Sequence, residues 1–208
     1  MNKDAIIKTA HAMADAARAV ILPYFRTDDL SADNKSAVGF DPVTAADRAA
    51  ERAMIEVLRA HRPEDAVLGE EFGEIAGTSG LTWVLDPVDG TRAFLSGTPT
   101  WGVLIAVRDQ DGPIYGLIDQ PYIGERFEGG FGLSRMTGPH GGRMLRVRGG
   151  RPLSQAILFS TFPEVGAPDE AAAFGRVAQA VQLVRYGMDC YAYALLAAGQ
   201  IDLVIEAG

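Results

Sequence analysis

The 208-residue sequence predicts a layered α/β (α+β) domain. Two helical patterns come first, short strand-like runs fill the middle, and helices alternate with strands in the last third. With 48% hydrophobic and 22% charged residues, the composition is typical of a folded globular protein. We therefore expect a single unit over 1–208, built from a lobe at 1–138 and a second lobe at 139–208.

The first third of the chain predicts two helices. Apolar residues recur at helical spacing over 3–26, and a polar connector follows at 28–34. A second helical pattern begins near Ala46 and ends near His61 and Pro63.

The rest of the chain predicts short strands separated by turns and two more helices. Apolar runs bounded by turn residues predict strands at 66–68, 81–85, 103–107 and 114–118. A glycine-rich stretch at 138–142 predicts a hairpin loop that leads to 144–147. Alternation follows, with strands at 156–160, 183–186 and 201–205 and helices at 170–181 and 190–198.

Composition excludes several classes of protein. No apolar run approaches the roughly 20 residues that span a bilayer, so we expect no membrane segment. The net charge of -8 argues against a nucleic-acid binder, because such proteins normally carry a basic face. The single cysteine, Cys190, cannot form an internal disulfide, which favours the cytoplasm.

Carboxylates gather in three short segments, at 41–47, 69–71 and 86–91. The third follows a predicted buried strand that delivers Asp86 to the sheet edge. Pro87 predicts a turn there, after which Asp89 faces the same point. Gly90 and Thr91 then open a predicted helix, whose free backbone N–H groups suit a phosphate.

Gathering Glu70, Asp86 and Asp89 has an electrostatic cost. Two like charges about 4 Å apart repel by about 1 kcal/mol in water and about 4 kcal/mol at an effective dielectric near 20. Such a cluster takes up protons or binds a hard cation, and oxygen ligands favour Mg²⁺ over zinc. Metal-assisted hydrolysis of a phosphate ester is therefore the leading hypothesis.

Each segment alone also has a purely structural interpretation. Thr44 and Asp47 have the spacing of a capping box, so Asp47 can simply cap the second helix. Glu70 and Glu71 fit a solvated turn, and Asp-Pro and Asp-Gly pairs are common in turns. The combination of all three segments is what favours a site.

Taken together, these residues resemble the inositol monophosphatase superfamily along essentially the whole chain. The resemblance rests on Lys35 and on the segments Asp41-x-Val43-Thr44-x-x-Asp47, Gly69-Glu70-Glu71 and Asp86-Pro87-Val88-Asp89-Gly90-Thr91. It implies an α-β-α-β-α sandwich whose N-terminal lobe binds two or three Mg²⁺ ions per site. It also implies lithium sensitivity and a homodimer.

Other segments resemble the bacterial histidinol-phosphate phosphatases of this superfamily. These are Arg92-Ala93-Phe94, Pro99-Thr100-Trp101-Gly102, Gly116-Leu117-Ile118-Asp119-Gln120-Pro121 and Asp189-Cys190-Tyr191-Ala192-Tyr193. The implied reaction converts L-histidinol phosphate and water to L-histidinol and phosphate, in histidine biosynthesis. The alternatives are an inositol, nucleotide or sugar phosphatase, and a non-catalytic binding protein on the same fold.

The resemblance assigns ligands to the metals. Glu70, Asp86 and the Val88 carbonyl would hold the first Mg²⁺, and Asp86 and Asp89 would share the second. Lys35 would lie in the region of a third metal.

The resemblance also assigns the catalytic and phosphate-binding roles. Thr91, paired with Asp47, would orient the attacking water, and Glu70 would help to deprotonate it. The N–H groups of Gly90 and Thr91 would hold the phosphate.

Substrate choice would come from later segments. The resemblance places Glu206 against the alcohol part of the substrate, and acidic groups at Glu206 and Asp189 suit the ammonium of histidinol. Asp189 has an alternative role as the N-cap of the helix that begins at Cys190. Arg92 fits either substrate binding or a dimer interface.

The sequence departs from the family pattern at its end. Family members continue past the strand that matches 201–205 into a Trp-Asp or Tyr-Asp motif, whose Asp binds the second metal. This sequence ends at Gly208, before such a residue. We expect a truncated chain that lacks its C-terminal elements; a complete chain of this length would bind the second Mg²⁺ weakly and have low activity.

Overall fold

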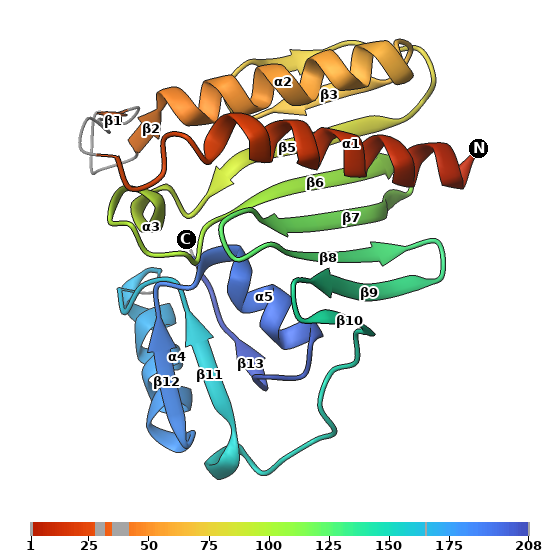
Figure 1. Cartoon of the computed structure of the whole chain (residues 1–208). Helices are drawn as coiled ribbons and strands as arrows, with labels where there is room; N and C mark the ends of the chain where they lie inside the picture. The colour runs from red at the N-terminus through yellow and green to blue at the C-terminus, as the bar shows by residue number, and fades with distance from the viewer. Residues whose placement is uncertain (1, 28–31, 35–41, 165, 208) are drawn as a thin grey trace.

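The computed structural model describes residues 2–27, 32–34, 42–164 and 166–207. Helices α1 (Lys3–Ile21) and α2 (Ala45–His61) cover one face of a large sheet, and α5 (Asp189–Ala197) lies on its other face. A small sheet and α4 (Pro168–Ala180) complete the α-β-α-β-α arrangement. In Figure 1 the helices α1 and α2 and the large sheet occupy the upper part, and α5, the small sheet and α4 lie in the lower part. The predicted layered fold class is confirmed.

The large sheet has eight strands in the order β10-β9-β8-β7-β6-β5-β3-β4. Neighbouring strands are antiparallel except β3 and β5, which run parallel. The bounds are β3 (Ala66–Gly69), β4 (Gly73–Ile75), β5 (Thr82–Asp89), β6 (Gly102–Asp109), β7 (Gly112–Gln120), β8 (Glu125–Gly130), β9 (Leu133–Gly138) and β10 (Gly141–Met144). A separate short pair, β1 (Ala32–Asn34) and β2 (Pro42–Thr44), precedes α2.

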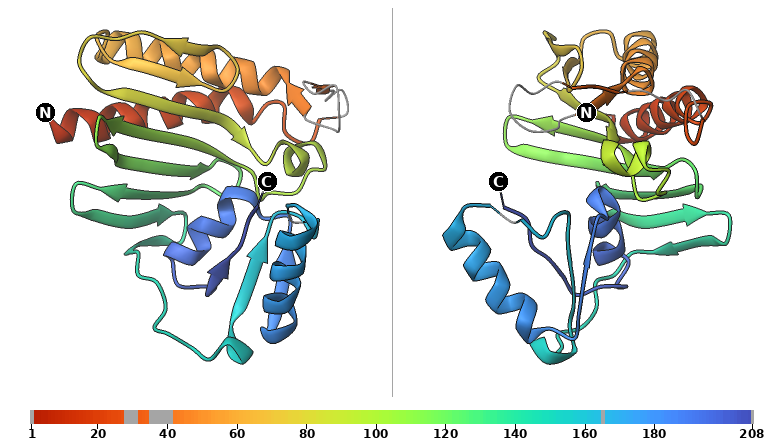
Figure 2. Two further views of the ribbon diagram at one scale, coloured as in Figure 1. Left: turned by 180° about the vertical axis from the view of Figure 1, so that it is seen from behind. Right: turned by 90° about the vertical axis from the view of Figure 1, so that its left-hand side faces the viewer.

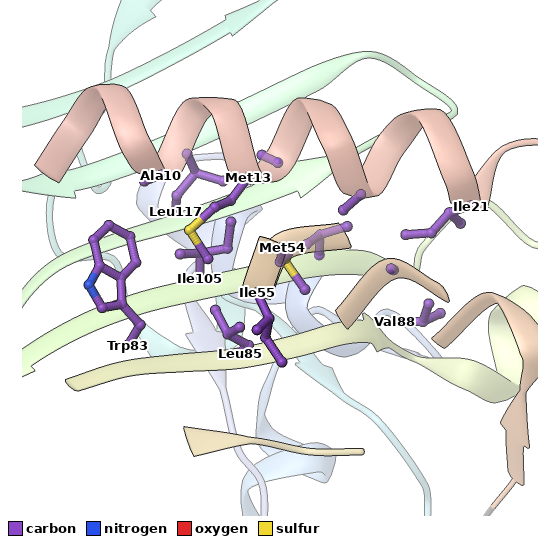
Figure 3. Close-up of a cluster of buried hydrophobic side chains, with 14 of the residues drawn as sticks. Ala10, Met13, Ile21, Met54, Ile55, Trp83, Leu85, Val88, Ile105 and Leu117 are labelled. Atoms are coloured by element: carbon purple, nitrogen blue, oxygen red, sulfur yellow. The ribbon is translucent and has the colours of Figure 1, made fainter. Parts of the chain in front are cut away.

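The main core lies between the two N-terminal helices and the large sheet (Figure 3). Met13 of α1 and Met54 of α2 point toward Trp83 and Leu85 of β5 and Ile105 of β6, all fully or almost fully buried. Both helices are amphipathic, so each turns its apolar stripe to the sheet. This packing fixes β5 and β3, the strands that carry the acidic residues.

The small sheet is parallel, with β11 (Ile157–Ser160) between β12 (Leu183–Tyr186) and β13 (Leu203–Val204). Phe174 of α4 packs against Leu158 of β11 on one face. Ala192 of α5 packs with Phe159 of β11 on the other, so α5 fills the space between the two sheets (Figure 2). A 3-10 turn, Leu153–Gln155, precedes β11.

Most predicted elements are present, and the differences are these. Helix α1 ends at Ile21, and the chain makes turns over 22–26, where Arg26 has a φ of 64°. Strands β1, β2, β4, β8 and β9 were not predicted. The strand expected at 144–147 is wrong, because β10 spans Gly141–Met144 and begins within the stretch expected to be a loop. The sequence of β8, Glu-Arg-Phe-Glu-Gly-Gly, lacks strand alternation because buried charged residues occupy its core positions.

The prediction that Pro87 forms a turn after the strand is wrong. Strand β5 continues through Asp89, and its pairing with β6 shifts register between Asp86 and Asp89. A proline cannot donate to a sheet ladder, and an irregularity of this kind tolerates it. The register shift therefore shapes the segment that carries both aspartates.

Buried ion pairs join α1 to the far part of the large sheet. Glu128, 3% exposed, accepts hydrogen bonds from Tyr115 Oη at 2.6 Å and Arg135 Nε at 2.7 Å, and His11 Nε2 of α1 lies 3.1 Å away. Arg18 of α1 likewise bonds to Asp119, which is fully buried. No helix in the described parts of the chain is long and apolar enough to cross a bilayer.

Candidate active site

The candidate site begins where the parallel strands β3 and β5 end. Gly69 of β3 pairs with Leu85 of β5, and the Glu70 N–H donates to the Leu85 carbonyl at 3.2 Å. Glu70 therefore follows β3 at the level where Asp86 follows Leu85. The parallel register brings two carboxylates that are 16 positions apart to one sheet end.

Asp86 lies at the centre of the acidic set. Its pKa is raised to about 9, first because the group is buried and then because Asp89 and Glu70 place negative charges beside it. A hydrogen bond with the Glu70 carboxyl group and the charge of Asp47 raise its pKa further. Asp89, Glu70 and Asp47 therefore each lie close enough to Asp86 to raise the pKa of its carboxyl group.

These residues fit a hard cation in chemistry. Asp86 Oδ1 is buried and has no hydrogen-bond partner among the described residues. Carboxylate oxygens that crowd one another are the donors that Mg²⁺ prefers. Within the described parts of the chain, no three His, Cys, Asp or Glu side chains are grouped as a ready metal centre.

Asp47 has the structural role that the sequence left open. It is the third residue of α2 and belongs to a capping box, where its Oδ2 accepts from the Thr44 N–H at 2.9 Å and from the Thr44 hydroxyl at 2.5 Å. Burial raises its pKa, against the effect of these bonds. The hydroxyl of Thr91 donates instead to the Val88 carbonyl at 3.1 Å. The expected pairing of Thr91 with Asp47 therefore differs from the bonds that these two side chains make here.

The predicted helix after Asp89 is present as α3 (Thr91–Leu95). Gly90 precedes it with a φ of 83°, a left-handed conformation that glycine adopts without strain. Its carbonyl accepts from the Phe94 N–H at 3.0 Å, which closes the first turn. The Gly90–Thr91 backbone thus lies beside the acidic set, where a phosphate group was expected.

The start of α5 meets this segment. Asp89 Oδ2 accepts from the Cys190 N–H at 2.6 Å, so Asp89 holds the first turn of α5. The alternative role of Asp189 as N-cap is wrong, because Met188 holds that position and Asp189 is the first helical residue. Asp189 has a φ of 44°, and its Cγ lies only 2.9 Å from where a Cβ on Gly90 would stand.

The three predicted substrate-binding side chains lie near one another. The pKa of Asp189 is raised to about 6, first by burial and then by the charges of Asp89 and Glu206, while Arg92 lowers it. Glu206 Oε1 accepts from the N–H and hydroxyl of Thr161 at 2.8 and 2.9 Å, which anchors the end of the chain to β11. Arg92 lies over the ring of Phe162, 4.6 Å from its centre.

Glu51 is a buried acidic residue that the sequence did not reveal as part of the site. Its Oε2 accepts from the Glu71 N–H at 2.7 Å and its Oε1 from the Phe72 N–H at 2.9 Å. It lies four positions after Asp47, on the apolar face of α2 that also carries Met54 and Leu58. A charged residue on the apolar face of a predicted helix was the one feature of the sequence that could have indicated a buried role for Glu51. Lys35 and Asp41 lie outside the described residues.

A cavity of about 450 Å³ lies between α5 and the large sheet. Side chains from Leu117, Phe127, Leu145 and Ala194 line it, together with Cys190. Burial raises the pKa of the Cys190 thiol well above its ordinary value, and the charge of Asp89 adds to this. No Lys, Arg or His is among the residues that line the cavity.

The fold and the acidic set define an inositol monophosphatase-type protein, and the chain belongs to the inositol monophosphatase family over residues 2–208. It is 41% identical over 209 residues to the Arabidopsis thaliana bifunctional phosphatase IMPL2, chloroplastic, covering 99% of this chain and 58% of that protein. It is 35% identical to the Streptomyces coelicolor histidinol-phosphatase, covering 96% and 77%. An inositol monophosphatase structure from Zymomonas mobilis has a TM-score of 0.83 at 36% identity, covering 99% and 78%.

Proposed function

We propose that the protein is a Mg²⁺-dependent phosphate monoester hydrolase that acts on L-histidinol phosphate. The convergence of Glu70, Asp86 and Asp89 beside the Gly90–Thr91 backbone carries this proposal. The choice of substrate is supported by the similarity to the Streptomyces histidinol-phosphatase. The proposed reaction would belong to histidine biosynthesis.

Carboxylate ligands account for the metal dependence. Glu70, Asp86 and the Val88 carbonyl would hold one Mg²⁺, and Asp86 with Asp89 a second, while Lys35 is proposed near a third. When bound, Mg²⁺ lowers the pKa of water and offsets the charge of the phosphate oxygens. An acidic protein can then accept an anionic substrate.

The chain's own groups would position the reactants. The N–H groups of Gly90 and Thr91 would hold the phosphate, and Glu70 would take a proton from the attacking water. A P–O bond forms to this water oxygen, the bond to the ester oxygen breaks, and the ester oxygen takes up the proton that Glu70 accepted, so that histidinol leaves as an alcohol. Because Asp47 is hydrogen-bonded to Thr44, we propose that it holds the start of α2 in place beside the site. The hydroxyl of Thr91 would orient the attacking water.

Asp189 and Glu206 would recognise the alcohol part of the substrate. Histidinol carries an ammonium group that inositol lacks, and two neighbouring carboxylates favour a cation. Arg92, at the same place, would limit the excess negative charge. The short sequence motifs and these acidic groups together favour histidinol phosphate over inositol phosphate.

A substrate panel with Mg²⁺ tests the proposal. We expect a higher kcat/KM for histidinol phosphate than for inositol 1-phosphate. Asp189→Asn should raise KM roughly tenfold for histidinol phosphate alone, because one charge-assisted contact is lost. The exposed Asp169→Asn on α4 serves as the control. Faster hydrolysis of inositol 1-phosphate would overturn the substrate, and no Mg²⁺-dependent hydrolysis of either would favour a non-catalytic binding protein.

Inositol phosphate hydrolysis is the second candidate. It is favoured by the likeness to the Zymomonas mobilis inositol monophosphatase, at 36% identity and a TM-score of 0.83. The two lobes, a homodimer, a cytoplasmic location and the lack of a nucleic-acid partner stay predictions. Sedimentation of the purified chain checks the homodimer.

A further inference from the structure

Glu51 lies beneath the loop that carries Glu70. Its side chain belongs to α2 and is fully buried. Both carboxylate oxygens accept backbone N–H groups of the loop, one from Glu71 at 2.7 Å and one from Phe72 at 2.9 Å. Such charge-assisted bonds are stronger than neutral ones, so the carboxylate fixes two successive peptide units.

Gly69 provides the space for this contact. A Cβ on Gly69 would stand 1.8 Å from Glu51 Oε1 and 2.6 Å from its Cδ. Any side chain at this position would therefore push the Glu51 carboxylate out of its place. The glycine in the Gly69-Glu70-Glu71 segment thus serves Glu51, 18 positions earlier in the chain.

Together these contacts fix the backbone on both sides of Glu70. The Glu70 N–H bonds to the Leu85 carbonyl at 3.2 Å, and the next two N–H groups bond to Glu51. Three successive N–H groups are therefore anchored, two of them by one carboxylate. The Glu70 carboxyl group lies beside that of Asp86.

We propose that Glu51 is a positioning residue that holds the 69–72 loop so that Glu70 can bind a divalent cation. This inference rests on the proposed function, because it needs Glu70 to be a metal ligand. Replacing a residue that orients a metal ligand without itself touching the metal typically lowers metal affinity or activity by about 10- to 100-fold.

Glu51→Gln is the first test variant, with Glu56→Gln as its matched control on the exposed side of α2. Glutamine keeps the size of the side chain but has only one accepting atom, so one loop N–H faces an amide donor. We expect the affinity for Mn²⁺, measured from free Mn²⁺ by electron paramagnetic resonance, to fall about tenfold or more. The control should match the wild type.

Gly69→Ala tests the same contact from the other side. It should weaken Mn²⁺ binding to a similar extent, because the added methyl group displaces Glu51. Gly116→Ala in β7 is the control, since a Cβ there meets no atom within 4 Å. Hydrogen exchange should show faster exchange of the Glu71 and Phe72 amides in both test variants and in neither control.

The outcomes separate this inference from the proposed function. Weaker Mn²⁺ binding with folded, cooperatively melting variants supports the positioning role. A Glu51→Gln variant that melts at a lower temperature but binds Mn²⁺ like the wild type overturns it, because Glu51 is then merely structural. A wild-type chain that binds no Mn²⁺ overturns both the inference and the proposed function.

Discussion

Asp86 combines burial, negative neighbours and an unpartnered oxygen. The pKa of its carboxyl group is raised to about 9, and Oδ1 makes no hydrogen bond to the described residues. A buried polar atom without a partner costs about 1–3 kcal/mol. A structural role alone does not explain why such a group stands next to Glu70 and Asp89, whereas a cation site does.

Asp86→Asn tests this explanation at the level of one residue. In the wild type, Mg²⁺ should raise the melting temperature, since ligand at 100 times its Kd adds about 2.7 kcal/mol of stability. The variant should lose this Mg²⁺-dependent increase and the phosphatase activity. Without metal it should melt at or above the wild-type temperature, because one member of a crowded acidic set has been neutralised.

Asp111→Asn, in the exposed turn between β6 and β7, is the control for this measurement and should respond to Mg²⁺ like the wild type. If Asp86→Asn were still stabilised by Mg²⁺, Asp86 would not be a ligand.

At the scale of elements, the segment that leads into the short helix α3 contacts the first turn of α5, and we call this contact the α3–α5 joint. Asp89 accepts from the Cys190 N–H, and Asp189 lies against Gly90. Thr100, just before β6, donates to the Gly187 carbonyl at 2.9 Å and ties the segment before α5 to the large sheet. The groups proposed to bind phosphate and those proposed to bind the alcohol are thereby kept in one arrangement.

Gly90→Ala tests this joint. Its φ of 83° makes alanine unfavourable by about 1–2 kcal/mol, and the added Cβ would stand 2.9 Å from Asp189 Cγ. Gly97→Ala at the other end of α3 is the control, with a φ of 72° and only an ordinary contact, 3.5 Å from Arg26 Cγ. We expect similar losses of unfolding free energy in urea but a higher substrate KM only for Gly90→Ala. Equal KM values in the two variants would contradict the joint.

At the scale of the whole molecule, a buried charged network fastens α1 to the sheet. Burial would raise the pKa of Glu128, but hydrogen bonds from Tyr115, Arg135 and His11 outweigh it and the pKa is lowered. A lowered pKa in the folded state means that Glu128 contributes stability at neutral pH. This contribution is lost as the pH falls below 4.5, the ordinary value, and through the lower folded-state value.

Glu128→Gln should lower the free energy of unfolding at pH 7 by about 2 kcal/mol, because charge-assisted hydrogen bonds are lost. The difference from the wild type should shrink as the pH falls below about 4, since Glu128 then takes up a proton in both states. Denaturant unfolding from pH 3 to 7 measures this, with the exposed Glu74→Gln as control. A difference that stays constant with pH would show that the Glu128 charge does not matter.

The sequence predicted much of this arrangement because its signals are local. Periodicity located α2 and α5, and the motif around Asp86 located the start of the helix α3. The parts that were missed depend on distant partners. Glu51 interrupts the apolar face of α2, and its role is visible only where the 69–72 loop donates to it. The charged residues of β8 and of its neighbour β7 are explained only by their partners, since Arg135 binds Glu128 of β8 and Arg18 binds Asp119 of β7.

The register shift within β5 could also not be predicted from the sequence. Asp-Pro commonly begins a turn, and only the pairing with β6 shows that the strand continues to Asp89. In this structure Asp47 accepts from the Thr44 hydroxyl, and the Thr91 hydroxyl donates to the Val88 carbonyl. Local chemistry predicted which residues gather, and tertiary contacts decided their hydrogen bonds.

Crystals of the chain soaked in Mn²⁺ and measured for anomalous scattering give the most direct test of the central claim. We predict an anomalous peak bounded by the carboxylates of Glu70, Asp86 and Asp89, and its loss in Asp86→Asn crystals. A peak at another place, or none at saturating Mn²⁺, would contradict the claim that these acidic segments form a divalent-cation site.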